Sequence, residues 1–263
     1  MGDVVPATPA EFWQLVREGG FRKPTTGICP GYAQANLVVL PKELAFDFLL
    51  FCQRNPKPCP VLDVTEPGSP HPMLAGPEAD LRTDIPRYRV YQRGKLVDEP
   101  TDLHAYWRDD LVGFLLGCSF SFERALLANE IPVRHMEEGV NVPMFITSRE
   151  CVPAGIFRGP LVVTMRPVPA EKVVRAVQVT SRFPSVHGAP IHIGDPAFLG
   201  IKDLSRPQFG DAVTIKEGEV PVFWACGVTP QAVAMRVHPE LMITHAPGYM
   251  FITELKDELL GVI

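Results

Sequence analysis

Residues Pro221–Gln231, PVFWACGVTPQ, contain the pattern of a strand, a sharp turn and the start of a helix. The apolar run Pro221–Cys226 predicts a buried strand, which Gly227 interrupts. Thr229 then fits the cap of a helix, with a proline at the first helical position. In open α/β sheets ligands bind at the carboxyl ends of the strands, so this turn is a place where chemistry is expected.

The remaining sequence on both sides of this turn consists of short elements separated by prolines and glycines. Helices are predicted over Thr8–Gly19, Pro41–Arg54, Leu103–Leu116, Ser121–Asn129, Ala170–Thr180 and Gln231–Arg236. Strands are predicted over Pro60–Val64, Arg87–Tyr91, Lys95–Val97, Met144–Ser148, Leu161–Arg166, Pro221–Cys226, Met242–His245 and Tyr249–Thr253. The alternation of strands and helices near the end favours a mostly parallel or mixed sheet.

These elements predict an α/β fold of mixed α+β character with two domains. Residues 1–114 plus 216–263 would form a discontinuous α/β domain, in which the N-terminal and C-terminal segments share one sheet. Residues 115–215 would form a smaller α+β domain inserted between them.

Composition excludes several classes of protein. The chain has 263 residues with 28 Pro and 21 Gly, yet 46% of its residues are hydrophobic, which is enough for a core and argues against disorder. The net charge of −5 comes without any basic cluster, so neither a nucleic acid nor a membrane surface is an expected partner. No apolar run approaches the roughly 20 residues of a membrane-spanning helix, and no secretory signal is evident, so a cytoplasmic location is expected. The six cysteines show no Cys-x-x-Cys spacing and are interpreted as free thiols.

Polar side chains are densest in the loop 180–195, TSRFPSVHGAPIHIGD. Arg182 could hold a carboxylate through two parallel hydrogen bonds, and the imidazoles of His187 and His192 could transfer protons at neutral pH. Ser181 and Asp195 add further polar groups. The alternative is a solvated turn with Asp195 as a cap.

A metal site is a second interpretation of the same loop. His187, His192 and Asp195 could form a site of two histidines and one carboxylate, with His245 as an addition. The spacing of the two loop histidines is not diagnostic, and no His-x-x-x-His or His-Glu-x-x-His helix is present. Histidines that act through hydrogen bonds are therefore favoured, and no metal is assigned.

The segment Gly117–Glu123, GCSFSFE, places hydroxyl groups and a carboxylate at the start of a predicted helix. Ser119 or Ser121 could simply cap that helix, and Glu123 could favour its dipole. In the functional alternative, the helix start receives an anionic substrate while Glu123 acts as acid or base.

Three more residues lie at the ends of predicted strands. Cys226 could be a nucleophile, since a thiol near a helix N-terminus has a lowered pKa, or it could only line a pocket. His245 would reach the same sheet edge. Arg166, at the end of another apolar strand, would face either a pocket or solvent.

Taken together, six motifs resemble the hydro-lyase family that includes D-glutamate cyclase. They are Gly117–Glu123 (GCSFSFE), Asn141–Met144 (NVPM), Thr164–Pro167 (TMRP), Thr180–Pro196 (TSRFPSVHGAPIHIGDP), Pro221–Gln231 (PVFWACGVTPQ) and Thr244–Gly248 (THAPG). The resemblance implies a two-domain α/β fold. In the characterised branch it also implies conversion of D-glutamate to 5-oxo-D-proline with loss of water.

The expected site follows from what this reaction needs. The candidate catalytic residues are Glu123, His187, His192 and Cys226, and the candidate substrate-binding residues are Ser119, Arg166, Ser181, Arg182, Asp195 and His245. Arg182, His187, His192, Glu123 and Cys226 are expected to meet in one pocket. The expected partner is a small acid, no cofactor is required, and a homo-oligomer is left open. Two alternatives remain: a metal-assisted hydro-lyase acting on a hydroxy or keto acid, and a non-catalytic sensor of a small acid.

Overall fold

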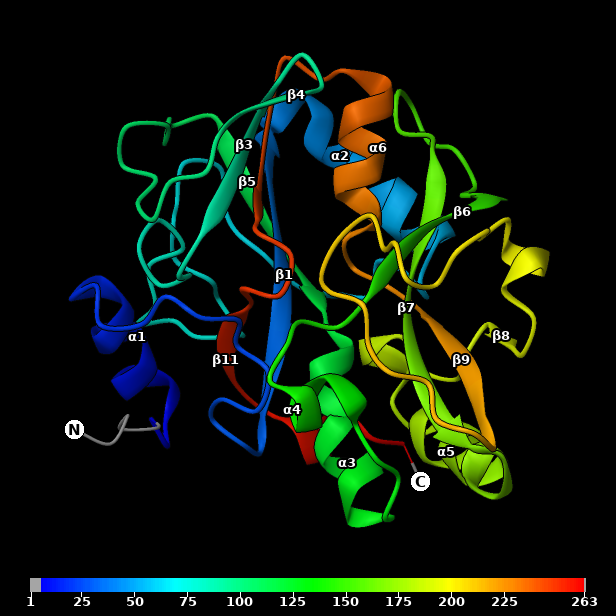
Figure 1. The fold of residues 1–263 in the computed structure, drawn as a ribbon. Helices are drawn as coiled ribbons and strands as arrows, with labels where there is room; N and C mark the ends of the chain where they lie inside the picture. Colours follow the sequence, from blue (N-terminus) through cyan, green and yellow to red (C-terminus); the bar gives the residue numbers. More distant parts are fainter. Residues whose placement is uncertain (1–5, 263) are drawn as a thin grey trace.

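The computed structural model describes residues 6–262 and contains two antiparallel sheets with helices packed around them (Figure 1). The helices are α1 (Pro9–Arg17), α2 (Lys42–Arg54), α3 (Glu123–Ala128), α4 (Arg134–Glu138), α5 (Val173–Ser181) and α6 (Thr229–Val237). The strands are β1 (Tyr32–Pro41), β2 (Val61–Val64), β3 (Tyr88–Gln92), β4 (Lys95–Asp98), β5 (Leu111–Gly117), β6 (Met144–Glu150), β7 (Pro160–Pro169), β8 (His192–Ile193), β9 (Glu219–Ala225), β10 (Leu241–His245) and β11 (Phe251–Lys256). Short 3-10 turns include η1 (Ser119–Phe122), η2 (Ala170–Lys172), η3 (Pro184–Val186), η4 (Pro196–Leu199) and η5 (Asp257–Leu260). The mixed α/β class predicted from the sequence is confirmed.

The first sheet is built around β1. Its order is β2-β5-β1-β10-β3-β4, and β11 also pairs with β1. On one edge β1 pairs with β5 from Ala35 to Pro41, and on the other edge it pairs first with β11 and then with β10. One face of this sheet packs against α1 and the 75–85 loop, and the other packs against α2 and α6.

The second sheet has the order β6-β7-β9-β8. One face of it, with Val168, Val222 and Trp224, packs against α3 and α5, and the opposite face carries Phe145 and Phe223. Helix α6 also contacts β7, so the second sheet adjoins the first through this helix. Figure 1 shows α6 between the two sheets at the top of the view.

Two sequence predictions in the first sheet were wrong. The segment predicted as a helix over Leu103–Leu116 ends instead in strand β5, because Leu111–Gly117 is buried along its whole length between β1 and β2. Strand β1 was not predicted, although nine of its ten residues are buried. It contains Gln34 and Asn36, which break the apolar run that marks a buried strand.

The predicted orientation of the strands was also wrong, because every pairing among the described residues is antiparallel. Strand β9, predicted to share a sheet with the N-terminal segment, pairs with β7 and β8 in the second sheet. Strands β10 and β11 do join the N-terminal segment, as expected. The division into two domains stays a prediction.

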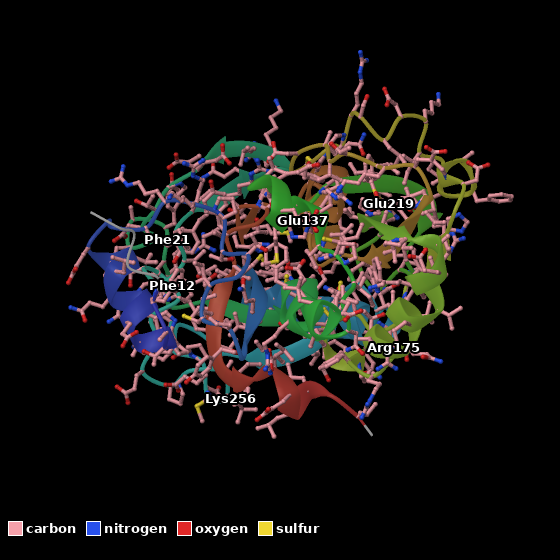
Figure 2. The ribbon with its side chains drawn as sticks, turned by 60° about the horizontal axis from the view of Figure 1, so that its bottom comes forward. Phe12, Phe21, Glu137, Arg175, Glu219 and Lys256 are labelled. Carbon is pink, nitrogen blue, oxygen red and sulfur yellow. The ribbon has the colours of Figure 1, made fainter. Side chains whose placement is uncertain are left out.

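The capping signal was accurate for α1, whereas the predicted cap of α6 was wrong, because Thr229 is itself the first helical residue and its hydroxyl donates to the carbonyl of Cys226. Thr8 caps α1 in a capping box with Glu11, and Pro9 is the first helical residue, as predicted. Phe12 on α1 packs edge-on against Phe21, and Figure 2 shows both rings on the same side of the molecule. The six cysteines are free thiols and are all buried. Within residues 6–262 no helix is long and apolar enough to cross a membrane.

Candidate active site

A buried ion pair links strand β7 of the second sheet to the start of helix α3. Arg166 on β7 donates from Nε (3.2 Å) and Nη2 (2.5 Å) to Oε1 of Glu123, the first residue of α3. The side chains are only 1% and 4% exposed, respectively. A charged pair with so little access to water is costly to bury, and such pairs often mark functional sites.

Arg166 makes two further hydrogen bonds to protein side chains. Nη1 donates to Thr164 Oγ1 (3.1 Å) and Nη2 to Ser119 Oγ (3.0 Å). The guanidinium carbon lies 5.4 Å from the ring centre of Phe122 and 5.6 Å from that of Trp224. Arg166 is thus held in one position by two hydroxyls and two aromatic rings, and of the two alternatives that the sequence left open it faces the interior and not solvent.

Glu123 has two further partners that the sequence analysis did not identify. His135 Nε2 lies 3.1 Å from Glu123 Oε1, and the Thr26 hydroxyl donates to Oε2 at 3.1 Å. The imidazole of His135 stacks on Phe120 with 5.9 Å between ring centres. His135 stands in no motif that identifies it, and Thr26 lies in a glycine-rich turn more than ninety residues away in the chain.

Helix α4 is anchored so that His135 faces Glu123. Its first residue, Arg134, forms ion pairs with Glu137 at 3.3 Å and with Glu219 at the start of β9. Figure 2 shows Glu137 and Glu219 on neighbouring segments, whereas Arg175 of α5 lies on a different part of the surface. Helix α4 is therefore fixed to the second sheet, and His135 with it.

The charges of the cluster control the state of Glu123. Burial alone would raise the pKa of this carboxyl, but its electrostatic interactions and hydrogen bonds with His135 and Arg166 lower it below its ordinary value. Glu123 is therefore a carboxylate at neutral pH. Its Oε2 accepts a hydrogen bond from Thr26 and has capacity to accept another proton donor.

A cavity of about 130 Å³ reaches this cluster. Its lining includes Glu123, Phe120 and Gln34, together with residues 27–32 and Met136. The cavity is smaller than the sites that hold drug-sized ligands, so it suits a small molecule.

The THAPG segment is connected to the same region through Thr25. The Thr25 hydroxyl donates to Gln34 Oε1 (2.8 Å), and its main-chain N–H donates to the carbonyl of Gly248 (2.8 Å). The main-chain N–H of Gln34 in turn donates to Ser121 Oγ (2.9 Å). A hydrogen-bonded path thus runs from the 244–248 turn to the start of the Glu123 helix. Ser121 therefore bonds the backbone of β1.

Asn36 on β1 contacts two of the six motifs, at Gly117 and at Gly227. Its Nδ2 donates to the carbonyl of Gly117 (2.8 Å), and its side chain lies so close to Gly227 that a Cβ there would come within 2.0 Å of it. Asn141 makes an equivalent contact on the second sheet's side, where Nδ2 donates to the carbonyl of Pro247 (3.0 Å). Five of the six motifs singled out in the sequence are therefore linked by Arg166, Asn36, Asn141 or Thr25.

Cys226 lies in this region, but its thiol is not activated. It is buried in an apolar cluster with Cys118, Val162 and Met250. Burial raises the pKa of Cys226 to about 11, although the N–H of Val228 and the charge of Arg166 act in the opposite direction. The expected lowering of its pKa was therefore wrong, and its role as a nucleophile stays a prediction.

His187 and His245 are buried as neutral imidazoles. Burial lowers the pKa of each to about 4. His187 Nδ1 lies 2.5 Å from the carbonyl of Lys57, and His245 Nδ1 accepts from the N–H of Leu37 at 3.1 Å. The positive charge of Arg166 adds to the lowering of the pKa of His187.

The other loop residues do not join the cluster. Ser181 Oγ donates to the carbonyl of Gln178, and Arg182 Nε donates to the carbonyl of Val262, both on the exposed side of α5. His192 Nε2 lies 2.7 Å from the carbonyl of Asp195, whose own side chain caps η4. Of the five residues expected to meet in one pocket, Arg182 and His192 lie elsewhere, and among the other three only Glu123 lines the cavity.

The metal interpretation finds no support in this arrangement. Among residues 6–262, no three His, Cys, Asp or Glu side chains are grouped so that they could hold a metal ion. His187 and His192 each turn toward a main-chain carbonyl instead of toward one another.

The chain is similar to a known protein family and to several proteins named as hydro-lyases. A family model described as D-glutamate cyclase matches residues 112–254. A hydro-lyase-named protein of Geobacillus kaustophilus is 67% identical over 258 residues, which cover 98% of each chain. A similarly named protein of a Thermoanaerobacter species is 69% identical over 96% of each chain. The Bacillus subtilis protein named "Putative hydro-lyase YcsI" is 66% identical over 97% of this chain and 99% of its own.

Proposed function

The chain belongs to the D-glutamate cyclase family, and we propose that it converts D-glutamate to 5-oxo-D-proline in the cavity beside Glu123. The family and the names of its relatives support a lyase that removes water. The observation that carries the finer proposal is the buried cluster of Glu123, Arg166 and His135, of which Glu123 lines that cavity.

The reaction sets three chemical requirements. The α-ammonium group must lose a proton so that its nitrogen can attack the γ-carboxyl carbon. A carbon–nitrogen bond then forms and a carbon–oxygen bond breaks. The nitrogen loses two protons in all, and the departing oxygen takes up both of them to leave as water. Because both reacting groups belong to one molecule, holding the folded conformer supplies much of the acceleration.

The cluster offers a group for each proton transfer. The carboxylate of Glu123, kept ionised by Arg166 and His135, is placed to accept the proton from the ammonium group at Oε2. In this proposal Glu123 also returns the proton to the departing oxygen, and His135, which does not line the cavity, acts through its contact with Glu123 Oε1. Arg166 acts as a positioning residue, because each of its three guanidinium nitrogens donates to a protein side chain and Arg166 does not line the cavity.

The decisive experiment incubates the purified protein with D-glutamate or L-glutamate and measures 5-oxoproline by chromatography. We expect product from D-glutamate only. Glu123→Gln should lower kcat by about 100-fold or more, as expected for loss of a proton-transfer group. Product from neither enantiomer, with binding retained, would instead support the sensor alternative.

Glu123→Gln also leaves Arg166 buried without its counter-charge, so a milder variant is needed. Thr26→Val removes one hydrogen bond to Oε2 and leaves the Arg166 pair intact. We expect a smaller fall in kcat with an almost unchanged melting temperature. Unchanged kcat in both variants would contradict the proposed role of Glu123.

A further inference from the structure

A second cavity, of about 230 Å³, lies where β3 faces the 208–210 segment and the turn after β10. Its walls include Arg87, Arg89, Glu99, Gln208, Phe209 and Tyr249. None of its lining residues lines the cavity beside Glu123. The two cavities are therefore separate sites.

Both arginines of this cavity are held by aromatic rings. The guanidinium carbon of Arg87 lies 5.1 Å from the ring centre of Tyr249, and that of Arg89 lies 5.9 Å from the ring centre of Phe209. Stacking fixes the plane of each guanidinium before a ligand arrives, so less freedom is lost on binding. The backbone is fixed too, because the N–H of Ala246 donates to the carbonyl of Arg87 (2.8 Å).

The charges in the cavity do not cancel. Arg89 Nε forms an ion pair with Glu99 Oε1 at 2.8 Å, and the Arg89 side chain is 22% exposed. Within residues 6–262 Arg87 has no carboxylate partner. Two positive charges and one negative charge leave a net charge of +1 on the walls. A planar guanidinium matches a carboxylate through two parallel hydrogen bonds.

We propose that the Arg87–Arg89 cavity binds a small monocarboxylate. The single excess positive charge matches one carboxylate better than the double charge of a phosphate monoester, and the Gln208 amide can bond a neighbouring carbonyl or N–H of the ligand. The proposal concerns binding and does not depend on turnover at Glu123.

The test is isothermal titration calorimetry at low ionic strength with 5-oxo-D-proline as the monocarboxylate and inorganic phosphate as the competing anion. We expect the native protein to bind 5-oxo-D-proline more tightly than phosphate. Arg87→Gln and Arg89→Gln should each weaken that binding by about ten-fold to a hundred-fold, since a hydrogen bond to a charged group is lost. Arg236→Gln removes the same charge from an exposed ion pair with Glu150 and should leave binding unchanged.

A fourth variant should change the affinity for 5-oxo-D-proline in the opposite direction. Glu99→Gln removes the carboxylate that competes for Arg89 and should tighten binding of 5-oxo-D-proline. Binding that survives in Arg87→Gln and Arg89→Gln but disappears in Glu123→Gln would overturn the proposal, because the ligand would then occupy the Glu123 cavity. Absence of binding by the native protein, or a preference for phosphate, would overturn it as well.

Discussion

The Glu123 cluster and the 180–195 loop both contain charged and polar side chains, but the fold treats them differently. In the cluster, Glu123 and Arg166 are buried and bond mainly to side chains from distant segments. In the loop, Arg182, His192 and Asp195 bond to main-chain groups close to the surface, and of the loop's candidate site residues only His187 is buried. Density of polar residues along the sequence therefore indicated the loop, whereas the three-dimensional structure concentrates charge in the cluster.

The largest expected difference is in stability. Arg166→Leu leaves Glu123 as a buried carboxylate without its main counter-charge, so the free energy of unfolding should fall by about 3–5 kcal/mol. Denaturant titration followed by circular dichroism measures this change. A loss below about 1 kcal/mol would show that the pair is not essential to the fold and would remove the contrast with the loop.

The second difference is in the response to acid. The folded pKa of His187 is about 4, below its ordinary value of about 6.5, so the unfolded state binds more protons between these values and stability falls as pH decreases through that window. The contribution is about 3 kcal/mol between pH 7 and pH 4. In His187→Gln the unfolding free energy should depend less on pH in this window.

Glu123 responds in a lower pH range. Its folded pKa is depressed, so its stabilising effect is present above its unfolded value and is lost as pH falls through the folded value. Glu123→Gln should therefore flatten the acid side of the profile below about pH 4.5, the ordinary range of a glutamate. Equal slopes in the native protein and both variants would contradict these assignments.

A third comparison concerns the contact between the 180–195 loop and Gly117, the last residue of β5. A Cβ at Gly117 would lie 2.0 Å from the carbonyl oxygen of Ser185, a clash between two backbones. Gly117→Ala should therefore lower the free energy of unfolding by about 1–3 kcal/mol, in the range of overpacked cores. Gly194→Ala is a control for a loop glycine without close neighbours, although its positive φ adds some strain of its own. A Gly117→Ala protein as stable as the native one would show that the loop can move away.

The smallest effects are expected in the loop itself. Arg182→Ala should change the free energy of unfolding by no more than about 0.5 kcal/mol, as is usual for exposed positions. His192→Ala should lower it by about 1 kcal/mol, because the half-buried imidazole packs against Phe198 and Phe223. If the proposed site is correct, both variants should also retain 5-oxoproline formation. A large loss of 5-oxoproline formation in either variant would indicate that the active site includes the 180–195 loop and would contradict the proposed site.

The sequence predicted local structure well where side chains act on their own backbone. The capping box of α1 and the hydrogen-bonding role of Asp195 at a turn both depend on neighbours in the chain. The strand β1 and the orientation of the sheets depend on long-range pairing, which periodicity does not record. Gln34 and Asn36 made β1 look unlike a core strand because their polar groups are satisfied by distant partners such as Thr25 and Gly117.

The site was predicted only in part for the same reason. Glu123, Arg166 and Ser119 stand in motifs and were identified, and the structure brings them together. His135 and Thr26 carry no local signal, since each becomes significant only through its contact with Glu123. Arg182 and His192 were expected in the pocket because of their chemistry, but their backbone positions direct them to the carbonyls of Val262 and Asp195.

The pairing of β1 has a consequence for the order of folding. One edge of this strand is completed only by β10 and β11, which begin at Leu241 and Phe251, more than two hundred residues after β1 begins. During synthesis this edge of β1 therefore stays unpaired until residues 241–256 emerge. Contacts of such long sequence separation slow folding and prolong exposure to aggregation. Removal of the last fifteen residues should consequently leave the protein insoluble rather than merely less active.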